Sequence, residues 1–406
     1  GSLAQLSVAE IANIQGRFRD HLDQRAVVLA HSTVDLADKL KVLQQGEEWP
    51  STSRDDIPQI IQSRTSHEHK LVFTFAGQGG QWWKMGRRLL LEEPCYRRAI
   101  DEFDAVFQGI AGWSVVDEML ADEKSSRVDE AAVTQPTIFA VQIGLAALWQ
   151  QRGIEPDIVI GHSFGEVAAA YIAGAISLQT AAVLIHKRGL IKDQAGSQGA
   201  MAVVALAPEQ LTPFLPMDGS VDIAAFNGPA MATISGAVEG VQQTLRAIEA
   251  YDPAIFTRYL KMDFAWHSSA LEPVESWFLS AVGELTWQMP RIPIVSTVTG
   301  MLETVFDASY WWRNLRQPVC YTAAIESALE LAGDTFIELG PHRTLSGLTT
   351  GIAQACDRSP FIINSLHREQ DDFEALAYAT GALYVAGVEV NWAGFTPAVA
   401  AKSVSL

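Results

Sequence analysis

The sequence has few cysteines and fewer basic than acidic residues. Three cysteines occur in a chain of 406 residues, more than 30 positions apart and without a C-x-x-C pair: Cys95, Cys320 and Cys356. This spacing excludes a disulfide framework and a cysteine zinc site, so we expect reduced thiols and a cytoplasmic protein. Lys and Arg number 29 against 47 Asp and Glu, which gives a net charge of −18. Such acidity argues against binding to nucleic acid.

Long apolar runs and metal motifs are also missing. No run of 18 uncharged apolar residues occurs, and no basic segment followed by an apolar one begins the chain, so we expect neither a membrane span nor a signal peptide. Neither the motif H-E-x-x-H nor a paired spacing of His and carboxylate residues occurs, so the sequence predicts no metal site. The hydrophobic share of 48% favours a folded chain over a disordered one. Gly1-Ser2 is typical of a cloning remnant, so we expect the chain to be part of a longer protein.

Two glycine turns that follow short apolar runs indicate an α/β fold. The run Leu71–Ala76 ends in Gly77-Gln-Gly-Gly80, and the run Ile158–Ile160 ends in Gly161-His-Ser-Phe-Gly165 before a helix-forming segment. A strand, a glycine turn and a helix, repeated, predict a parallel sheet with helices on its faces. The first turn lacks G-K-[ST] and G-x-G-x-x-G, so nucleotide binding has little support.

Residues 199–262 carry a different pattern, which predicts an inserted subdomain. Strands and helices are expected there in the order βαββαβ, the ferredoxin-like split unit: Met201–Leu206, Pro208–Leu215, Val221–Phe226, Met231–Ser235, Ala237–Ala250 and Phe256–Leu260. The predicted fold is therefore α/β, with an α/β-hydrolase-like large subdomain of 70–198 and 263–365. We expect a cleft between the two subdomains.

The two ends of the chain are predicted to be linkers. Residues 1–69 have two helical patterns, Val8–Leu22 and Val34–Gln44, before a polar stretch from Gln45 to Lys70. They predict a small α/β linker domain that ends in an extended segment. Residues 366–406 form the tail, with an amphipathic helix expected over Asp371–Tyr384.

The turn Gly161-His-Ser-Phe-Gly165 matches a nucleophile elbow, which exposes Ser163 at the N-terminus of the following helix. A glycine turn with a serine N-cap is the structural alternative. A nucleophilic serine needs a base, and nine histidines are present. His267 is the best placed, where the chain leaves the insert, whereas His162, beside the serine, is expected to pack. The backbone N–H of Gln78 could donate to the oxyanion.

Arg188 lies near the end of the second helical segment, Leu178–Gly189. It could be a solvated helix-end arginine, which complements the helix dipole. Alternatively, its guanidinium could hold a substrate carboxylate through two hydrogen bonds. Sequence spacing alone leaves both possibilities open.

Ten stretches in order resemble the acyltransferase domains of modular type I polyketide synthases, which are related to the malonyl-CoA:carrier-protein transacylases. They are Gly77-Gln-Gly-Gly-Gln-Trp82, Thr134-Gln-Pro136, Gly161-His-Ser-Phe-Gly-Glu166, Arg188-Gly189, Gly199-Ala-Met201, Asn227-Gly-Pro229, His267-Ser268, Ser296-Thr-Val-Thr-Gly300, Tyr310-Trp-Trp-Arg-Asn-Leu315 and Glu338-Leu-Gly-Pro341. The resemblance covers nearly the whole chain. It implies that residues 1–69 are a ketosynthase-to-acyltransferase linker and 366–406 a post-acyltransferase linker.

The resemblance also implies roles for individual residues. Ser163 would be the nucleophile and His267 its base, oriented by main-chain carbonyls from the segment near Ser296 and not by an acidic side chain. The N–H groups of Gln78 and Phe164 would form the oxyanion hole. Arg188 would bind the substrate carboxylate, and Gln135 would line the same pocket.

The implied reaction moves a carboxyacyl group from coenzyme A to the phosphopantetheine thiol of an acyl carrier protein in a ping-pong mechanism. It needs no metal and no bound cofactor, and a neighbouring ketosynthase domain is expected in the parent chain. Candidates for docking the carrier are four basic residues that could equally be solvated helix faces: Arg87, Arg88, Arg97 and Arg98.

Extender choice in this family follows the four residues that end at the base. Malonyl-selective members usually have His-Ala-Phe-His and methylmalonyl-selective ones Tyr-Ala-Ser-His, whereas this chain has Phe264, Ala265, Trp266 and His267. The bulk of Trp266 favours malonyl, with methylmalonyl or another substituted malonyl as the alternative. A serine hydrolase of the esterase or patatin-like kind, and a catalytically silent docking module, are the other classes considered.

Overall fold

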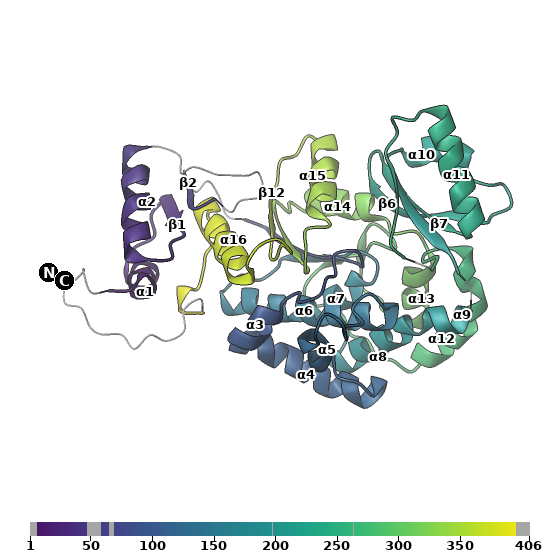
Figure 1. Ribbon diagram of the computed structural model, residues 1–406, viewed down its shortest axis with the longest axis horizontal. Coiled ribbons are helices and arrows are strands. Elements are labelled where there is room, and N and C mark those ends of the chain that lie inside the picture. The colour runs from purple at the N-terminus through teal and green to yellow at the C-terminus, as the bar shows by residue number, and fades with distance from the viewer. Residues whose placement is uncertain (1–5, 47–57, 65–68, 197, 263, 395–406) are drawn as a thin grey trace.

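A computed structural model describes residues 6–46, 58–64, 69–196, 198–262 and 264–394 (Figure 1). Its centre is a six-stranded sheet in the order β10-β9-β4-β3-β11-β12. Five neighbouring strands are parallel: β3 Leu71–Phe75, β4 Ile158–Gly161, β9 Ile294–Val295, β11 Thr335–Leu339 and β12 Phe361–Asn364. The edge strand β10, Leu302–Glu303, is antiparallel to β9. The expected parallel sheet is confirmed, and its strand β9 is only two residues long.

Helices cover both faces of this sheet because its strands are apolar on both sides. Phe73 and Phe75 pack with residues of α4, α6, α7 and α8, whereas Val72 packs on the other face with α14 and α15. The helices of this subdomain are α3 Arg87–Glu92, α4 Pro94–Ala111, α5 Val115–Leu120, α6 Ala131–Gln151, α7 Gly165–Ile172, α8 Leu178–Gly189, α9 Ile191–Ala195, α12 Glu275–Val282, α13 Ala308–Arg316, α14 Tyr321–Glu330 and α15 Ser346–Ala355.

Helix α6 has 21 residues and is the longest helix of the described chain. By length and composition it could cross a membrane, but 83% of its most apolar window is buried inside the protein. Such burial is that of a core helix, since α6 packs against α4 and α8 below the sheet.

The small subdomain has the predicted ferredoxin-like topology. Its antiparallel sheet has the order β6-β7-β5-β8, and its elements are β5 Ala200–Val204, α10 Pro208–Leu211, β6 Val221–Gly228, β7 Met231–Gly236, α11 Val238–Tyr251 and β8 Thr257–Tyr259. The sheet and its two helices share a separate apolar core that includes Val204, Ile234 and Ile248. Figure 1 shows this unit at the upper right, beside α14. A parallel bridge between Ala225 and Val319 connects it to the large subdomain.

The N-terminal unit contains two strands whose positions the sequence patterns did not indicate. Between α1 (Val8–Phe18) and α2 (Thr33–Gln45) lies β1, Gln24–Val28, which pairs antiparallel with β2, Ile60–Arg64. The polar stretch from Gln45 to Lys70 is therefore not wholly extended linker, although residues 47–57 and 65–68 lie outside the described chain. Each strand is five residues long and partly exposed, so neither shows a clear apolar alternation.

The tail helix α16, Asp372–Ala386, is not the amphipathic helix expected from its sequence. One side of it, including Leu376 and Leu383, belongs to the large core, and on another side a side chain at Gly381 would collide with Val27 of β1. The helix is thus buried on more than one side, between the large subdomain and the N-terminal sheet (Figure 1). A helix between two packed units has no wide polar face.

Candidate active site

The turn after β4 is a strained elbow that carries Ser163. The backbone of Ser163 has φ of 54°, in the left-handed region that non-glycine residues rarely adopt. A Cβ at Gly161 would lie 2.1 Å from the nitrogen of Glu166, and one at Gly165 would lie 2.2 Å from the carbonyl oxygen of Phe75. Both glycines are therefore required for the close approach of strand and helix. The turn places Ser163 directly before α7, as the sequence pattern predicts.

Ser163 and His267 are brought into hydrogen-bond contact. The Oγ atom of Ser163 lies 2.7 Å from Nε2 of His267, and Nδ1 of His267 lies 2.9 Å from the carbonyl oxygen of Gln317. Because a carbonyl only accepts, Nδ1 carries the proton and Nε2 accepts from the serine hydroxyl. The carbonyl comes from the residue after α13, so the expectation of a carbonyl near Ser296 is wrong. The hydroxyl of Ser296 instead pairs with that of Tyr310.

The environment of His267 favours its neutral form. Burial, and next the positive charge of Arg188, lower the pKa of His267 to about 3. The bond to Gln317 acts in the opposite direction, since it favours the protonated ring. The imidazole is therefore unprotonated at neutral pH, as a general base must be. In the described part of the chain, no acidic side chain is hydrogen-bonded to this ring.

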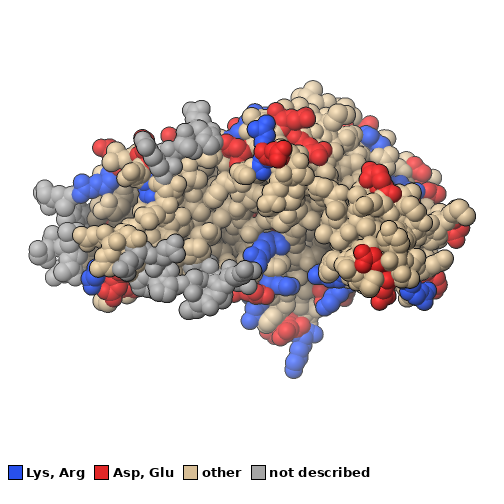
Figure 2. All heavy atoms as spheres, turned by 90° about the horizontal axis from the view of Figure 1, so that it is seen from above, with Lys and Arg blue, Asp and Glu red and all other residues tan. Residues whose placement is uncertain are grey.

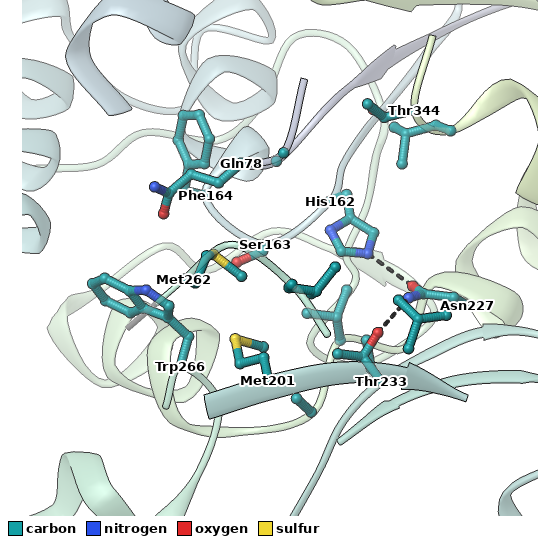
Figure 3. Close-up of a pocket in the computed structure, with 18 of the residues that line it drawn as sticks. Gln78, His162, Ser163, Phe164, Met201, Asn227, Thr233, Met262, Trp266 and Thr344 are labelled. Atoms are coloured by element: carbon teal, nitrogen blue, oxygen red, sulfur yellow. Dashed lines mark hydrogen bonds between the residues drawn. The ribbon is translucent and has the colours of Figure 1, made fainter. Parts of the chain in front are cut away.

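Ser163 lies in a cavity of about 440 Å³ between the two subdomains (Figure 3). The large subdomain contributes the segments Gly77–Gly79 and His162–Phe164. The small subdomain contributes Met201 and Val203 of β5 and Thr233 of β7. The expected cleft is thus present, and it contains the reactive pair.

Backbone donors also lie in the cavity wall. For the N–H groups of Gln78 and Phe164, the described residues provide no hydrogen-bond acceptor. Both residues line the cavity with Ser163, which is where an oxyanion hole would be needed. The side chain of Gln135 donates to that of Gln78 at 3.1 Å, and its own Oε1 is buried without a partner in the described chain.

Arg188 is buried on α8 and also lines the cavity. Its Nη1 donates to Oδ1 of Asn314 at 2.6 Å, while its Nε has no partner among the described residues. Burial lowers its pKa to about 9, and the negative charge of Glu166 partly counters this shift. The guanidinium remains a cation at neutral pH. An exposure of 1% excludes the solvated helix-end alternative.

Of the three residues that precede the base in the extender motif, only one reaches the cavity. Trp266 lines it, whereas Phe264 and Ala265 are buried and do not. Phe264 acts from behind, since its ring meets that of Trp266 edge to face with centroids 4.9 Å apart. Ala265 packs against Gly199, where a side chain would come within 2.5 Å of its Cβ.

His162 does more than fill space beside the serine. Its Nε2 lies 2.9 Å from Oδ1 of Asn227, whose Nδ2 donates to Thr233 at 3.1 Å (Figure 3). No sequence pattern indicated this bond between the subdomains. The roles of Asn314 and Glu166 were not indicated either, although both residues stand in the stretches that carry the family resemblance.

The basic residues considered for docking are mostly engaged within the chain. Arg87 donates to the carbonyls of Met119 and Ala121, and the other engaged residues form ion pairs: Arg88 with Glu92 and Asp371, and Arg97 with Asp101. These contacts favour the solvated helix-face alternative. Over the described ranges, no group of three or more His, Cys, Asp or Glu residues is arranged to hold a metal ion.

Residues 72–390 match the model of the acyl transferase domain. The chain belongs to this family. It is 34% identical over 399 residues to the highly reducing polyketide synthase pspA of Penicillium soppii, an alignment that covers 94% of this chain and 15% of that protein. The acyltransferase domain therefore spans a small part of the polyketide synthases it matches, which are multidomain chains.

Solved acyltransferase domains share its fold. The domain from the second module of the salinomycin polyketide synthase gives a TM-score of 0.86 at 32% identity, covering 100% of this chain and 93% of that one. The acyltransferase domain of SpnD, in complex with 2-(pent-4-yn-1-yl)malonyl, gives 0.80 at 26% identity, covering 98% and 91%. The described chain is accordingly an acyltransferase domain of the polyketide synthase kind.

Proposed function

We propose that this acyltransferase domain transfers a malonyl group from coenzyme A to the phosphopantetheine thiol of an acyl carrier protein. The observation that carries the proposal is the hydrogen-bonded pair of Ser163 and His267 in one cavity with the buried cation of Arg188. The pair provides a nucleophile and its base. The cation provides a partner for the free carboxylate of the acyl group.

The first half-reaction acylates Ser163. Its Oγ attacks the thioester carbonyl while Nε2 of His267 accepts the hydroxyl proton, and the resulting imidazolium keeps its Nδ1–H bond to Gln317. The oxyanion would be held by the N–H groups of Gln78 and Phe164. As the tetrahedral intermediate collapses, the carbon–sulfur bond breaks and His267 returns its proton to the departing thiolate.

The second half-reaction reverses these roles. The thiol of the carrier's phosphopantetheine gives its proton to His267 as its sulfur attacks the ester on Ser163. The carbon–oxygen bond to Ser163 then breaks, and the serine oxygen regains a proton from the imidazolium. The same base thus serves both steps, and no metal or redox cofactor enters either of them.

Arg188 supports a carboxyacyl substrate over a neutral one. A buried cation whose only bonded partner in the described chain is the neutral amide of Asn314 is costly to desolvate, and a substrate carboxylate would compensate for that cost. An acetyl group would leave it uncompensated. A simple esterase has no need for a buried arginine beside its serine, so Arg188 also favours the transferase over that alternative.

Trp266 supports malonyl over a larger extender. Its ring stands in the cavity wall beside Met262 and Met201 (Figure 3), and Phe264 backs it from behind. A substituent on the α-carbon would have to displace this ring or the methionines. The related SpnD domain holds a substituted malonyl group, so the family fold itself does not forbid such extenders.

The mouth of the cavity supports substrates that carry phosphate. Three exposed arginines line it, in an otherwise acidic chain: Arg258, Arg343 and Arg368. Seen from above, Lys and Arg side chains lie beside the hollow near the middle of the molecule (Figure 2). Both coenzyme A and phosphopantetheine carry phosphate groups that such residues bind well.

Intact-protein mass after brief incubation with malonyl-CoA, methylmalonyl-CoA and acetyl-CoA separately tests the proposal. A malonyl adduct is expected on the wild-type chain, absent from Ser163→Ala and discharged by holo carrier protein. Preference for acetyl, or hydrolysis of the adduct with no transfer to the carrier, would contradict it. A larger methylmalonyl adduct would contradict the extender choice alone.

A further inference from the structure

A buried hydrogen-bond network beneath Ser163 connects two groups of opposite charge. Asn314 on α13 stands between Glu166 and Arg188, with Nδ2 donating to Oε2 of Glu166 at 2.6 Å and Oδ1 accepting from Arg188 at 2.6 Å. Its Nδ2 also donates to the carbonyl oxygen of Ser163 at 3.1 Å. The three side chains of this network, Arg188, Asn314 and Glu166, are each at most 3% exposed.

The partners of Asn314 fix the orientation of its amide. A guanidinium only donates hydrogen bonds, whereas a carboxylate and a backbone carbonyl only accept them. The amide oxygen must therefore face Arg188, and the two amide hydrogens must face Glu166 and Ser163. No other orientation would satisfy all three neighbours, so the side chain is held in one position.

Glu166 is itself fixed by several donors, which makes it a firm support for Asn314. Its Oε2 also accepts from the hydroxyl of Tyr310 at 2.8 Å, and its Oε1 accepts from the backbone N–H and the hydroxyl of Thr297. Tyr310 and Asn314 are one turn apart on α13, so they reach the carboxylate from the same helix face.

This arrangement keeps the two charges apart. If Glu166 paired with Arg188 directly, its two oxygens would occupy the fork of the guanidinium. Asn314 instead takes only Nη1, and Nε is left without an acceptor among the described residues. Because Arg188 lines the cavity that contains Ser163, the rest of its fork is available to a ligand there.

We propose that Asn314 is a positioning residue that holds Arg188 in the orientation needed to bind the extender carboxylate, and that ties this arginine to the nucleophile elbow through the carbonyl of Ser163. The inference rests on the proposed function and assigns it a specificity-determining group. Asn314 touches neither the reacting atoms nor the substrate. Its effect should therefore be seen in the choice between a charged and a neutral acyl group.

The test compares malonyl-CoA with acetyl-CoA as donors for Asn314→Ala and Asn314→Asp. The control is Asn391→Ala, the same change at an exposed position of the tail. Asn314→Ala should lower kcat/KM for malonyl-CoA by about 10- to 100-fold, mainly through KM, and change that for acetyl-CoA by less than about threefold. Asn314→Asp, which has the same shape, should lower malonyl transfer further because its carboxylate competes for Arg188.

A double-mutant cycle with Arg188→Ala separates positioning from general damage. In that background, Asn314→Ala should not change the malonyl-to-acetyl ratio any further. Equal losses for both donors in both Asn314 variants would overturn the inference while leaving the proposed function standing. If the wild-type chain itself shows no preference for malonyl, the proposed function fails, and the inference fails with it. If Asn314→Ala does not fold, the malonyl-to-acetyl ratio of the isosteric variant Asn314→Asp tests the inference instead.

Discussion

Two buried glutamates at the reactive end of the sheet serve different parts of the site. Glu338, near the end of β11, is 2% exposed, and its carboxylate accepts hydrogen bonds from one local segment, residues 344–346, which lead into α15. Glu166 is 1% exposed and takes its bonds from Thr297, Tyr310 and Asn314, on two separate segments. One carboxylate supports the loop at the cavity mouth, and the other supports the floor beneath the serine.

The difference shows that the role of a buried carboxylate depends on where its hydrogen-bond donors lie in the chain. A carboxylate with local partners secures the start of one helix, because the N–H groups there lack other acceptors. A carboxylate with distant partners connects the elbow, α13 and, through Asn314, the buried Arg188, so its loss should affect both stability and substrate choice. Variants at the floor of the cavity and at its mouth should therefore have different effects.

Replacing each glutamate by alanine gives the largest expected effects. Glu166→Ala should lower the free energy of unfolding by about 3–5 kcal/mol, because it removes a buried countercharge from Arg188 and leaves several buried donors without an acceptor. Glu338→Ala should cost about 2–4 kcal/mol through the lost bonds of its loop. Urea denaturation measures both. Only Glu166→Ala should also lower the ratio of malonyl to acetyl transfer. An equal change of this ratio in both variants would show that the two glutamates do not serve different parts of the site.

The fold was largely predictable from the sequence, and the reasons are local. The turn Gly161–Gly165 could be recognised because only glycine allows its close approaches, and the ferredoxin-like insert because its strands and helices alternate clearly. Strands β1 and β2 were missed because their pairing joins short, half-exposed segments more than 30 residues apart. The wide burial of α16 likewise depends on units that pack from two sides.

The site was less predictable, because long-range contacts determine it. The partner of His267 is a main-chain carbonyl 50 residues away, and any residue type could supply it. Arg188 and Asn314 are 126 residues apart, so no spacing rule connects them. Ser163, His267 and Arg188 could be selected as candidates from motifs and resemblance, but the group that stands between the charges needed the three-dimensional arrangement.

The stability of the protein should depend on pH because His267 is held neutral in the cavity. In the unfolded chain a histidine titrates near pH 6.5, whereas in the folded chain burial and Arg188 lower its pKa to about 3. Between these values the unfolded state binds more protons, so stability falls as the pH falls. This group should contribute a loss of about 2 kcal/mol between pH 7 and pH 5.

The measurement is urea denaturation at both pH values for the wild type and His267→Ala. The variant lacks the group, so its loss between pH 7 and pH 5 should be smaller by that amount. Glu338→Ala should keep the full loss, because Glu338 is not among the groups that shift the pKa of His267. A wild type and a His267→Ala variant with the same pH dependence would show that the histidine is not held neutral.

A change in the apolar wall should affect extender size without affecting the charged floor. Trp266→Ala opens space beside the serine, so the ratio of methylmalonyl to malonyl transfer should rise about tenfold, which is typical of one methyl group in an apolar pocket. The malonyl-to-acetyl ratio should stay within about threefold of the wild type, since Arg188 and Asn314 are untouched. Competition between paired thioesters, read by intact mass, measures both ratios. A fall in the malonyl-to-acetyl ratio would show that wall and floor are not independent.

The smallest expected effect belongs to the mouth, where Arg343 stands on the loop that Glu338 supports. Arg343→Ala should raise the KM for malonyl-CoA about two- to fivefold and leave kcat unchanged, since an exposed charge pair contributes at most about 1 kcal/mol. The effect should shrink at high salt, because salt screens exposed charges. It should be absent with a malonyl thioester of N-acetylcysteamine, which carries no phosphate. Glu338→Ala should show the same pattern if its loop positions the arginine. Asn314→Ala should instead raise the KM for both malonyl donors, because in the proposed reaction the floor would bind the malonyl group and the mouth would bind the coenzyme A.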